Sequence, residues 1–425
     1  MNILLIGSGG REHAFSQKLT QSSLCSNLFV LPGNAGTSQL AKNVAIDNTD
    51  FPAIGNFCLE KKIELLIVGP EDLLVKGLRD FFESDPQLKE IAFVGPDAKG
   101  AQLEGSKDWS KAFMEKYNIP TAAYRTFNVD TMDAGIDYVK NHSLPVVLKA
   151  DGLAAGKGVL ICESNNDAVN ELKLMIQDKK FGEAGSKVVV EAFLNGIELS
   201  VFVLTDGTNY KILPSAKDYK RIGEGDTGLN TGGMGAVSPV PFADAVFMQK
   251  VEERIIKPSI LGLQKEQIHY TGFIFIGLMK VYDDPIVIEY NCRMGDPETE
   301  VVLPLIQNDF AELMLATAKG ELDKIQLQID SQSAATVMLV SKGYPGDYEK
   351  GKRISGLDLV TDSMLYHAGT RINENGELLS NGGRVMAVTS LGSNLKEALA
   401  MCMKNAEKIQ FENKYYRKDI GYEFI

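Results

Sequence analysis

Short apolar runs alternate with polar segments of helical length in the first hundred residues. The runs lie at 2–6, 28–31, 64–68 and 91–94, and each is followed at once by Gly or Pro. This alternation predicts repeated strand–helix–strand units, whose strands form a parallel sheet covered by helices. We therefore expect an α/β domain with a parallel sheet over residues 1–102.

Longer apolar runs follow, and several of them succeed one another across short turns. An example is GFIFIGLMKVYDDPIVIEYN at 272–291. Such directly linked runs predict antiparallel hairpins with interleaved helices. We expect a central α+β domain over 103–327, with a flap-bearing subdomain at about 121–192, and a small α+β domain over 328–425.

Charge and composition exclude several classes of protein. The 425 residues include 44 Lys and Arg against 56 Asp and Glu, a net charge of −12, and no basic run could track a nucleic acid. No apolar run approaches the roughly 20 residues that cross a bilayer. The five cysteines are scattered without a C-x-x-C pair. The sequence thus predicts a cytoplasmic protein without nucleic acid or membrane partners.

A glycine-rich loop, GSGGREH at 7–13, follows the first predicted strand and opens a helix. Backbone amides and the helix dipole favour an anion at such a position, although the glycines could instead only close a tight turn. The dinucleotide-binding pattern would need Gly where Glu12 stands, which disfavours NAD. Polar loops at 32–37 and 69–71 follow later strands of the same sheet. We expect the three loops to share one site.

A second glycine-rich loop, KADGLAAGKGV at 149–159, joins two predicted strands. It is similar to a P-loop, but Asp151 and Gly158 depart from the pattern G-x-x-x-x-G-K-[ST]. A flap over a sheet edge could still bind phosphates through its amides. Lys149 would then bind an anion, or else extend its amine from the sheet edge into solvent. Lys107, taken alone, is typical of ordinary surface.

Carboxylates follow two other predicted strands. Glu191 and Glu198 flank a turn, which by itself is typical of solvated acids. Strand alternation in IVIEYN at 286–291 puts Glu289 and Asn291 on one face. Two oxygen ligands suit Mg²⁺, because this ion keeps waters and phosphate oxygens as its other ligands. This strand end therefore predicts a metal site.

Eight motifs in order along the chain give it a resemblance to a known family. They are GSGGREHA at 7–14, PGNAGT at 32–37, IVGPE at 67–71, QLEGSK at 102–107, KADGLAAGKGV at 149–159, NTGGMGA at 230–236, VIEYNCRMGDPET at 287–299 and NGGRV at 381–385. On these motifs the chain resembles the ATP-grasp enzymes and, among them, the phosphoribosylamine–glycine ligases. The resemblance implies a central ATP-grasp fold. It also implies ATP-dependent joining of glycine to 5-phosphoribosylamine through a glycyl phosphate, giving glycinamide ribonucleotide, ADP and phosphate in purine synthesis.

The same resemblance implies roles for individual residues. Arg293 and Lys149 would be catalytic, with Arg293 stabilising the transferred phosphoryl group. The metal, Mg²⁺ or Mn²⁺, would be bound by Glu289 and Asn291. The ATP-binding residues would be Lys107 and Lys149 at the phosphates, Gly152, Gly156, Lys157 and Gly158 in the flap, Glu191, Ala192, Phe193 and Leu194 at the adenine, and Glu198 at the ribose.

The acceptor substrates are assigned from loop position. The phosphate of phosphoribosylamine is expected at Gly9, Gly10 and Arg11, with Asn34 and Glu71 close by. Asp218 and Asp296 are candidates for the glycine ammonium group. Many ATP-grasp enzymes carry a second metal-binding acid on the preceding strand, but GLMK at 277–280 has none, which weakens the expectation of a second protein-bound Mg²⁺.

Two other functions stay open at this stage. One is an ATP-grasp carboxylase or carboxylate–amine ligase with a different acceptor. The other is a non-catalytic nucleotide-binding module, which the intact phosphate and metal ligands argue against. The four histidines show no metal spacing and, like Trp109, are expected to be structural. We expect small-molecule substrates and a monomer or weak homodimer.

Overall fold

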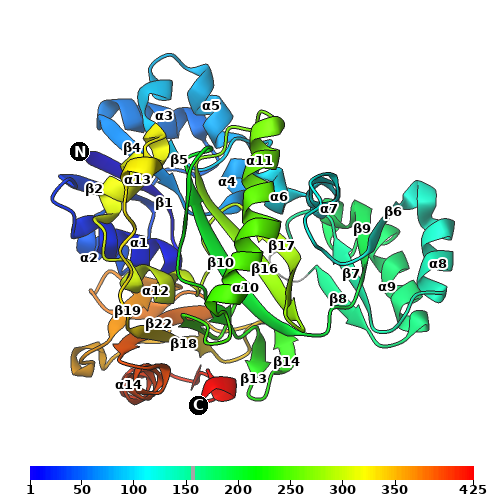
Figure 1. The fold of residues 1–425 in the computed structure, drawn as a ribbon. Coiled ribbons are helices and arrows are strands. Elements are labelled where there is room, and N and C mark those ends of the chain that lie inside the picture. The colour runs from blue at the N-terminus through cyan, green and yellow to red at the C-terminus, as the bar shows by residue number, and fades with distance from the viewer. Residues whose placement is uncertain (155–157) are drawn as a thin grey trace.

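The computed structural model describes residues 1–154 and 158–425. Its elements form an N-terminal domain, a central sheet from which a lobe projects, and a C-terminal domain (Figure 1). In Figure 1 the N-terminal domain is blue, the lobe is cyan to teal, and the C-terminal domain is orange to red. No helix in the described part of the chain is long and apolar enough to cross a membrane.

The N-terminal domain is built on a parallel sheet, as the apolar runs predicted. Its strands are β1 (Asn2–Gly7), β2 (Asn27–Pro32), β3 (Lys42–Asn43), β4 (Ile63–Val68) and β5 (Ala92–Val94), in the order β3-β2-β1-β4-β5. The helices of this region are α1 (Gly10–Thr20), α2 (Thr37–Leu40), α3 (Phe51–Glu60), α4 (Glu71–Val75) and α5 (Leu78–Ser84). Ile3 and Leu5 of β1 pack into one hydrophobic cluster, and Leu4 and Ile6 pack into another. Both faces of the sheet are therefore covered, which explains the unbroken apolar run.

The carboxyl ends of β1, β2 and β4 bring three polar loops together. The Gly33 amide donates to the Gly7 carbonyl (3.1 Å), and the Gly69 amide donates to the Ile6 carbonyl (2.9 Å). Gly33 has a φ of +72°, a conformation that favours glycine at this close approach. The three loops therefore lie next to one another, and their sharing of one binding site stays a prediction.

The central sheet is antiparallel and contains the predicted hairpin. Its strands β10 (Ile197–Thr205), β11 (Tyr210–Ile212), β16 (Gly272–Val281) and β17 (Asp284–Asn291) pair in the order β11-β10-β16-β17. Helices α10 (Ala245–Val251) and α11 (Lys257–Lys265) run across one face (Figure 1). Gly277 faces Glu289 and Leu278 faces Val287, so Ile288 is an extra residue, a β-bulge. The bulge interrupts the simple alternation that the sequence suggested for this strand.

The lobe has its own sheet and its own core. Strands β6 (Tyr124–Asn128), β7 (Val146–Ala150), β8 (Val159–Cys162) and β9 (Lys187–Ala192) pair antiparallel in the order β6-β9-β7-β8, beside α8 (Met132–Lys140) and α9 (Asn165–Ile176). Val139, Leu148, Leu172 and Val190 are among the buried residues that hold these elements together. The second glycine-rich loop joins β7 to β8, as predicted, and its residues 155–157 lie outside the described part of the chain. Helices α6 (Gln102–Gly105) and α7 (Lys107–Lys116) precede the lobe.

The C-terminal domain contains strands from two distant parts of the sequence. Its sheet has the order β12 (Lys217–Asp218), β15 (Gly235–Ser238), β18 (Ser333–Ser341), β22 (Arg384–Gly392) and β19 (Met364–His367), with β23 (Lys414–Tyr415) also on β18. Helices α12 (Thr299–Val302) and α13 (Phe310–Lys319) lead into this domain, and α14 (Leu395–Lys408) packs on β18 and β22. The small hairpins are β13 (Arg221–Gly223) with β14 (Thr227–Asn230) and β20 (Thr370–Ile372) with β21 (Leu378–Ser380). Strands β12 and β15 thus come from within the range predicted for the central domain.

Candidate active site

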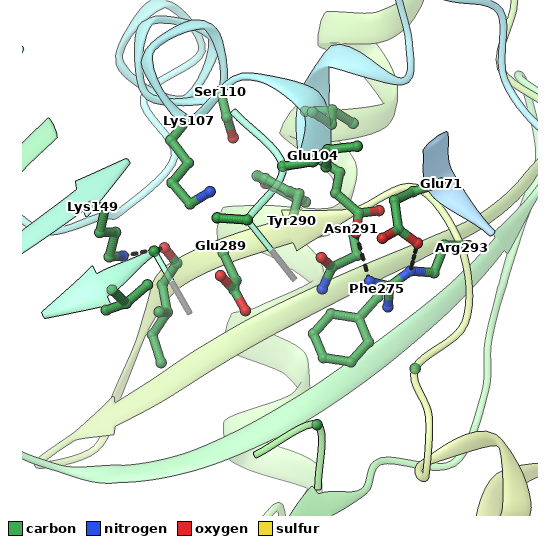
Figure 2. Close-up of a pocket in the computed structure, with 18 of the residues that line it drawn as sticks. Glu71, Glu104, Lys107, Ser110, Lys149, Phe275, Glu289, Tyr290, Asn291 and Arg293 are labelled. Atoms are coloured by element: carbon green, nitrogen blue, oxygen red, sulfur yellow. Dashed lines mark hydrogen bonds and ion pairs between the residues drawn. The ribbon is translucent and has the colours of Figure 1, made fainter. Parts of the chain in front are cut away.

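A cavity of about 410 Å³ lies where the N-terminal domain, the central sheet, the lobe and the C-terminal domain meet (Figure 2). Its charged and amide side chains are Arg11, Glu71, Glu104, Lys107, Lys111, Lys149, Glu191, Asp218, Lys220, Glu289, Asn291, Arg293, Asp296, Glu298 and Arg384. A second cavity of about 390 Å³ adjoins the first and shares Lys149, Glu191 and Glu289 with it. Residues from the N-terminal domain, the central sheet, the lobe and the C-terminal domain therefore meet at one site.

Most of the predicted nucleotide-binding residues line these cavities. Those that do are Lys107, Lys149, Gly158 and Glu191 in the first, and Ala192, Phe193, Leu194 and Glu198 in the second. Gly152 lines neither cavity, but its carbonyl lies 3.4 Å from the Lys107 Nζ. Gly156 and Lys157 lie outside the described residues. Except for Gly152, the described residues that are predicted to bind ATP thus line the two adjoining cavities.

Lys107 is placed by a capped helix end. The Asp151 carboxylate accepts hydrogen bonds from the Ser106 hydroxyl (3.0 Å) and from the Asp108 amide (2.8 Å). The Lys107 amide donates to the Asp151 carbonyl (3.1 Å), so the start of α7 is tied to the start of the flap loop. Burial lowers the pKa of Lys107, and the charge of Glu289 opposes this shift. Lys107 is therefore a cavity residue and not ordinary surface.

Lys149 does not extend into solvent from the sheet edge. Its side chain is 5% exposed, and its Nζ lies 3.0 Å from the Glu191 Oε1 and donates to the Ile288 carbonyl (3.2 Å). Strand pairing explains this position, because β7 is an inner strand of the lobe sheet, between β8 and β9. The alternative of a solvated edge lysine is wrong.

Glu289 and Asn291 lie side by side on β17 and face the cavity (Figure 2). Burial alone would raise the pKa of Glu289, but Lys220, Lys149 and Lys107 hold it below its ordinary value. Among the described residues, none donates a hydrogen bond to either side chain, and no three His, Cys, Asp or Glu residues gather into a metal centre. An ionised carboxylate and an amide that accept no hydrogen bond from the described residues have free oxygen atoms, which fit Mg²⁺ or Mn²⁺ as ligands.

Arg293 is held between two carboxylates of the N-terminal side (Figure 2). Its Nη2 lies 2.6 Å from the Glu104 Oε1, and its Nε lies 3.1 Å from the Glu71 Oε2. Glu104 also accepts a hydrogen bond from the Cys292 amide (2.9 Å). Burial raises the pKa of Glu104 to about 7, against the opposing charge of Arg293. Sequence reasoning missed Glu104, although it belongs to the QLEGSK motif.

The first glycine loop binds carboxylates of its own chain. The Gly9 amide donates to the Glu12 Oε2 (2.6 Å), and the Arg11 amide donates to the Asp296 Oδ2 (3.3 Å). The Arg11 guanidinium donates to Glu12 (2.6 Å) and to the Met294 carbonyl (2.9 Å). The helix end thus attracts negative charge, as predicted. A substrate phosphate at this loop stays a prediction. To bind there, the phosphate would have to replace the Glu12 and Asp296 carboxylates as the acceptor of these N–H groups.

The predicted acceptor-side residues divide into two groups. Arg11, Glu71, Asp218 and Asp296 line the first cavity, whereas Gly9, Gly10 and Asn34 line neither cavity. The Asn34 amide nitrogen donates to the carbonyls of Ser8 (2.8 Å) and His367 (2.7 Å), and its oxygen accepts from the Gly36 amide (2.8 Å). In the structure Asn34 braces the converging loops against the C-terminal domain.

Besides Glu104, four charged residues of the cavity were not predicted, namely Lys111, Lys220, Glu298 and Arg384. Lys220 pairs with Glu198, Arg384 lies 3.0 Å from Asp296, and Glu298 is buried beside Asp218. Burial, and next the charge of Asp218, raise the pKa of Glu298 to about 8. Arg384 belongs to the NGGRV motif, so that motif was the available signal. Trp109 stacks on Phe113 with ring centroids 5.4 Å apart, which confirms it as a packing residue.

Family models match the chain in three consecutive blocks. The phosphoribosylglycinamide synthetase N domain matches residues 1–104, and the ATP-grasp (A) domain of the same family matches residues 105–299. The C domain of that family matches residues 334–423. The three models together cover most of the chain.

Individual proteins are similar over full length. The phosphoribosylamine–glycine ligase of Haemophilus influenzae is 44% identical, over 100% of this chain and 99% of its own length. That of Caldanaerobacter subterraneus is 43% identical, over 99% of both chains. A crystal structure of the Thermotoga maritima phosphoribosylamine–glycine ligase has a TM-score of 0.84 and 34% identity, covering 99% of this chain and 100% of that one. A biotin carboxylase from Campylobacter jejuni has a TM-score of 0.72 at 14% identity, covering 99% and 94%, and is similar in fold alone.

Proposed function

The chain belongs to the phosphoribosylamine–glycine ligase family, and from this premise we propose that it joins glycine to 5-phosphoribosylamine in an ATP-dependent reaction of purine biosynthesis. It is an ADP-forming ligase with an ATP-grasp fold between an α/β N-terminal domain and a small C-terminal domain. A carboxylase or a non-catalytic module is not favoured, since the full-length relatives carry the ligase name. One observation supports the proposal most: the buried lysines, the Glu289–Asn291 pair and Arg293 line a single cavity.

ATP is proposed to span both cavities. The adenine would lie in the second cavity, against residues 191–194, with its ribose at Glu198. The phosphates would then lie in the first cavity at Lys107 and Lys149, whose charges offset those of the phosphate oxygens. This orientation of ATP is proposed because the first cavity, which is rich in cationic side chains, is also lined by Arg293 and by residues of the N-terminal domain.

Glu289 and Asn291 are the residues that would hold Mg²⁺ or Mn²⁺. Both present oxygen atoms to the cavity without hydrogen-bond donors among the described residues, and Glu289 is kept ionised by the surrounding lysines. When bound, such an ion supplies positive charge to phosphate oxygens. The side chains themselves fix where that charge can lie, because both are carried by the rigid strand β17.

The chemistry requires activation of glycine before ligation. A carboxylate is a poor electrophile, so we propose that glycine first accepts the γ-phosphoryl group and forms a glycyl phosphate. Glu71, Glu104 and the Met294 carbonyl engage three of the five N–H groups of Arg293, which leaves two for oxygens of the transferred phosphoryl group. The amine of phosphoribosylamine then attacks the carbonyl carbon and phosphate leaves. Asp218 or Asp296 would hold the glycine ammonium group.

Phosphoribosylamine is proposed to enter from the N-terminal side. Arg11 and Glu71 line the same cavity as the lysines, which supports an acceptor site next to the phosphoryl site. The sugar phosphate is assigned to Gly9, Gly10 and Arg11. We further propose a cytoplasmic monomer or weak homodimer, consistent with five cysteines that are all free.

Product analysis tests the function directly. ATP, glycine and freshly generated phosphoribosylamine are supplied together and with each omitted in turn. Glycinamide ribonucleotide, ADP and phosphate are expected only from the complete mixture, and efficient turnover with another acceptor would contradict the proposal. The glycyl phosphate is tested separately: with hydroxylamine in place of phosphoribosylamine, glycine hydroxamate is expected. Its absence, with normal ligation, would exclude a released or accessible acyl phosphate.

A further inference from the structure

Helix α7 presents one continuous face to the first cavity. Lys107, Ser110, Lys111 and Met114 all line it, at the i, i+3, i+4 and i+7 spacing of one helical face. The predicted phosphate contact Lys107 accounts for only one of these side chains. Lys111 is the other charged residue of the face, and neither the motifs nor the proposed reaction assigns it a role.

Lys111 is buried and bound on two sides. Its side chain is 2% exposed, and its Nζ lies 3.0 Å from the Glu191 Oε2. The other oxygen of the same carboxylate, Oε1, lies 3.0 Å from the Lys149 Nζ. Glu191 is therefore shared between two lysines, one from α7 and one from β7. A buried carboxylate with one lysine is neutral in sum, whereas this triad keeps one net positive charge beside the cavity.

Lys111 also lies where the lobe is attached to the central sheet. Its Nζ donates to the Thr121 hydroxyl (2.7 Å), which in turn donates to the Val287 carbonyl of β17 (2.8 Å). The Val287 amide donates to the Pro120 carbonyl (2.8 Å), so residues 120–121 are hydrogen-bonded to β17 just before the lobe begins. Lys111 thus connects the lobe strand that carries Glu191 with the strand that carries Glu289.

We propose that Lys111 is a positioning residue for the nucleotide: it holds Glu191 so that Lys149 keeps an uncompensated charge directed at the ATP phosphates. This inference rests on the proposed ATP site and adds to it. Without Lys111, Glu191 pairs with Lys149 alone, and the charge of Lys149 is neutralised. The lobe and the central sheet also lose one of their direct links. The expected consequence is weaker binding of ATP, with little change in the binding of glycine.

The charge of Lys111 is itself sensitive to pH. Burial lowers the pKa of Lys111 to about 8, with Glu191 opposing this shift and Lys149 adding to it. The titratable groups that face it are Glu191 on β9, Lys149 on β7 and Tyr124 on β6, whose ring centroid lies 5.6 Å from the Lys111 Nζ. Thr121 is the neutral partner. Loss of the Lys111 proton above that pH has the same expected effect as removing the side chain, namely weaker ATP binding.

The experiment compares three variants of the full-length protein. Lys111→Met removes the charge, Lys111→Arg keeps it at all working pH values, and Lys116→Met makes the same change on the exposed side of the same helix. The Lys116 side chain is 62% exposed and pairs with Glu266, away from the cavity. Calorimetry measures the dissociation constant of a non-hydrolysable ATP analogue with Mg²⁺, without the other substrates, between about pH 7 and 9.5. Thermal unfolding is recorded for each variant, and the KM values for ATP and glycine are measured where turnover permits.

We expect Lys111→Met to weaken analogue binding about tenfold or more at neutral pH, and to raise the KM for ATP but not that for glycine. Binding by the wild type is expected to weaken as the pH rises through about 8, whereas Lys111→Arg binds better than Lys111→Met and shows no such step. Equal affinities for Lys111→Met and Lys116→Met, or a pH step that persists in Lys111→Arg, would overturn the inference. A wild type that binds the analogue but makes no glycinamide ribonucleotide would instead refute the proposed function and leave this result interpretable.

Discussion

The two sides of the cavity differ in how their charged groups are satisfied. On the N-terminal side, Arg11 and Arg293 are engaged by Glu12, Glu71 and Glu104. On the side of the lobe and β17, Lys149 shares its carboxylate with Lys111, while Glu289 and Asn291 accept no hydrogen bond from the described residues.

This difference separates two kinds of site. The β17 side presents oxygen atoms that are not engaged in hydrogen bonds with the described residues and that are held in fixed positions. This is expected where a metal ion and a polyanion bind. The N-terminal side is a closed network of ion pairs, in which a substrate must exchange places with a carboxylate or use the remaining N–H groups. Substitutions on the β17 side would therefore remove a proposed metal ligand. Substitutions on the N-terminal side would instead change the position of the side chain with which the substituted residue is paired.

The largest effect on turnover is expected from substitutions on the β17 side of the cavity. Glu289→Ala, or Asn291→Ala, is predicted to lower turnover by about 100-fold or more, because each change removes a proposed metal ligand. The fold is expected to stay intact, since neither side chain has a hydrogen-bond partner to lose among the described residues. Product formation at saturating ATP measures the effect, and thermal unfolding checks the fold. Near-normal turnover at ordinary Mg²⁺ would refute the metal assignment.

A smaller effect on turnover is expected from substitutions in the ion-pair network of the N-terminal side. Glu104→Gln leaves Arg293 paired with Glu71 alone, and kcat is predicted to fall about tenfold, because a charge-assisted hydrogen bond contributes roughly 1.5 kcal/mol or more. The matched control is Glu60→Gln, whose parent carboxylate is 70% exposed and pairs with Lys61. Unchanged kcat in Glu104→Gln would mean that Glu71 alone positions Arg293.

The pH dependence of the closed network is expected to be more modest. Burial raises the pKa of Glu104 to about 7, so below this pH the carboxyl takes up a proton and Arg293 loses an ionised partner. Turnover is therefore predicted to fall several-fold on the acid side, and this step is expected to be absent in Glu104→Gln. The free energy of unfolding is expected to depend on pH in the opposite direction to turnover. Between 4.5 and about 7 the native protein binds more protons at Glu104 than the unfolded chain does, so the contribution of Glu104 to the free energy of unfolding falls as the pH rises.

The smallest effect tests the first glycine loop. A Cβ atom at Gly9 would lie 3.0 Å from the Asp296 Oδ2 and 3.0 Å from the Glu12 Oε2, close enough to displace one of these side chains slightly. Gly9→Ala is predicted to raise the KM for phosphoribosylamine by a few-fold, with the KM for ATP unchanged. Steady-state kinetics with each substrate varied in turn provides the measurement. An effect confined to ATP would exchange the assignments of the two glycine-rich loops.

Local pattern predicted the elements well, and for a physical reason. The parallel sheet follows from apolar runs that must be covered on both faces, and the β16–β17 hairpin follows from two apolar runs joined by a short turn. The bulge at Ile288 could not be predicted, because the amino-acid sequence does not show which residue of a strand lacks a partner. Both Ile288 and Glu289 therefore line the cavity, where simple alternation would have separated them.

The residues that sequence reasoning missed share one property. Glu104 acts on Arg293, and Lys111 acts on Glu191, so each is defined by a partner that is distant along the chain. A lysine or glutamate in a short helix has the same local pattern whether it is solvated or buried in an ion pair. The candidate ligands of ATP and metal could be named from motifs, whereas the residues that position them required the tertiary structure.

The sheet of the C-terminal domain has a consequence for how the protein is made. Strand β15 pairs with β18, yet about a hundred residues separate them along the chain. While the ribosome is still producing residues 239–332, one edge of β15 has no strand to pair with, and an unpaired edge is a site for aggregation. Cutting the chain near residue 328 would create the same exposed edge permanently. The last quarter of the polypeptide therefore completes the folding of a segment synthesised much earlier, and it cannot be treated as a detachable appendage.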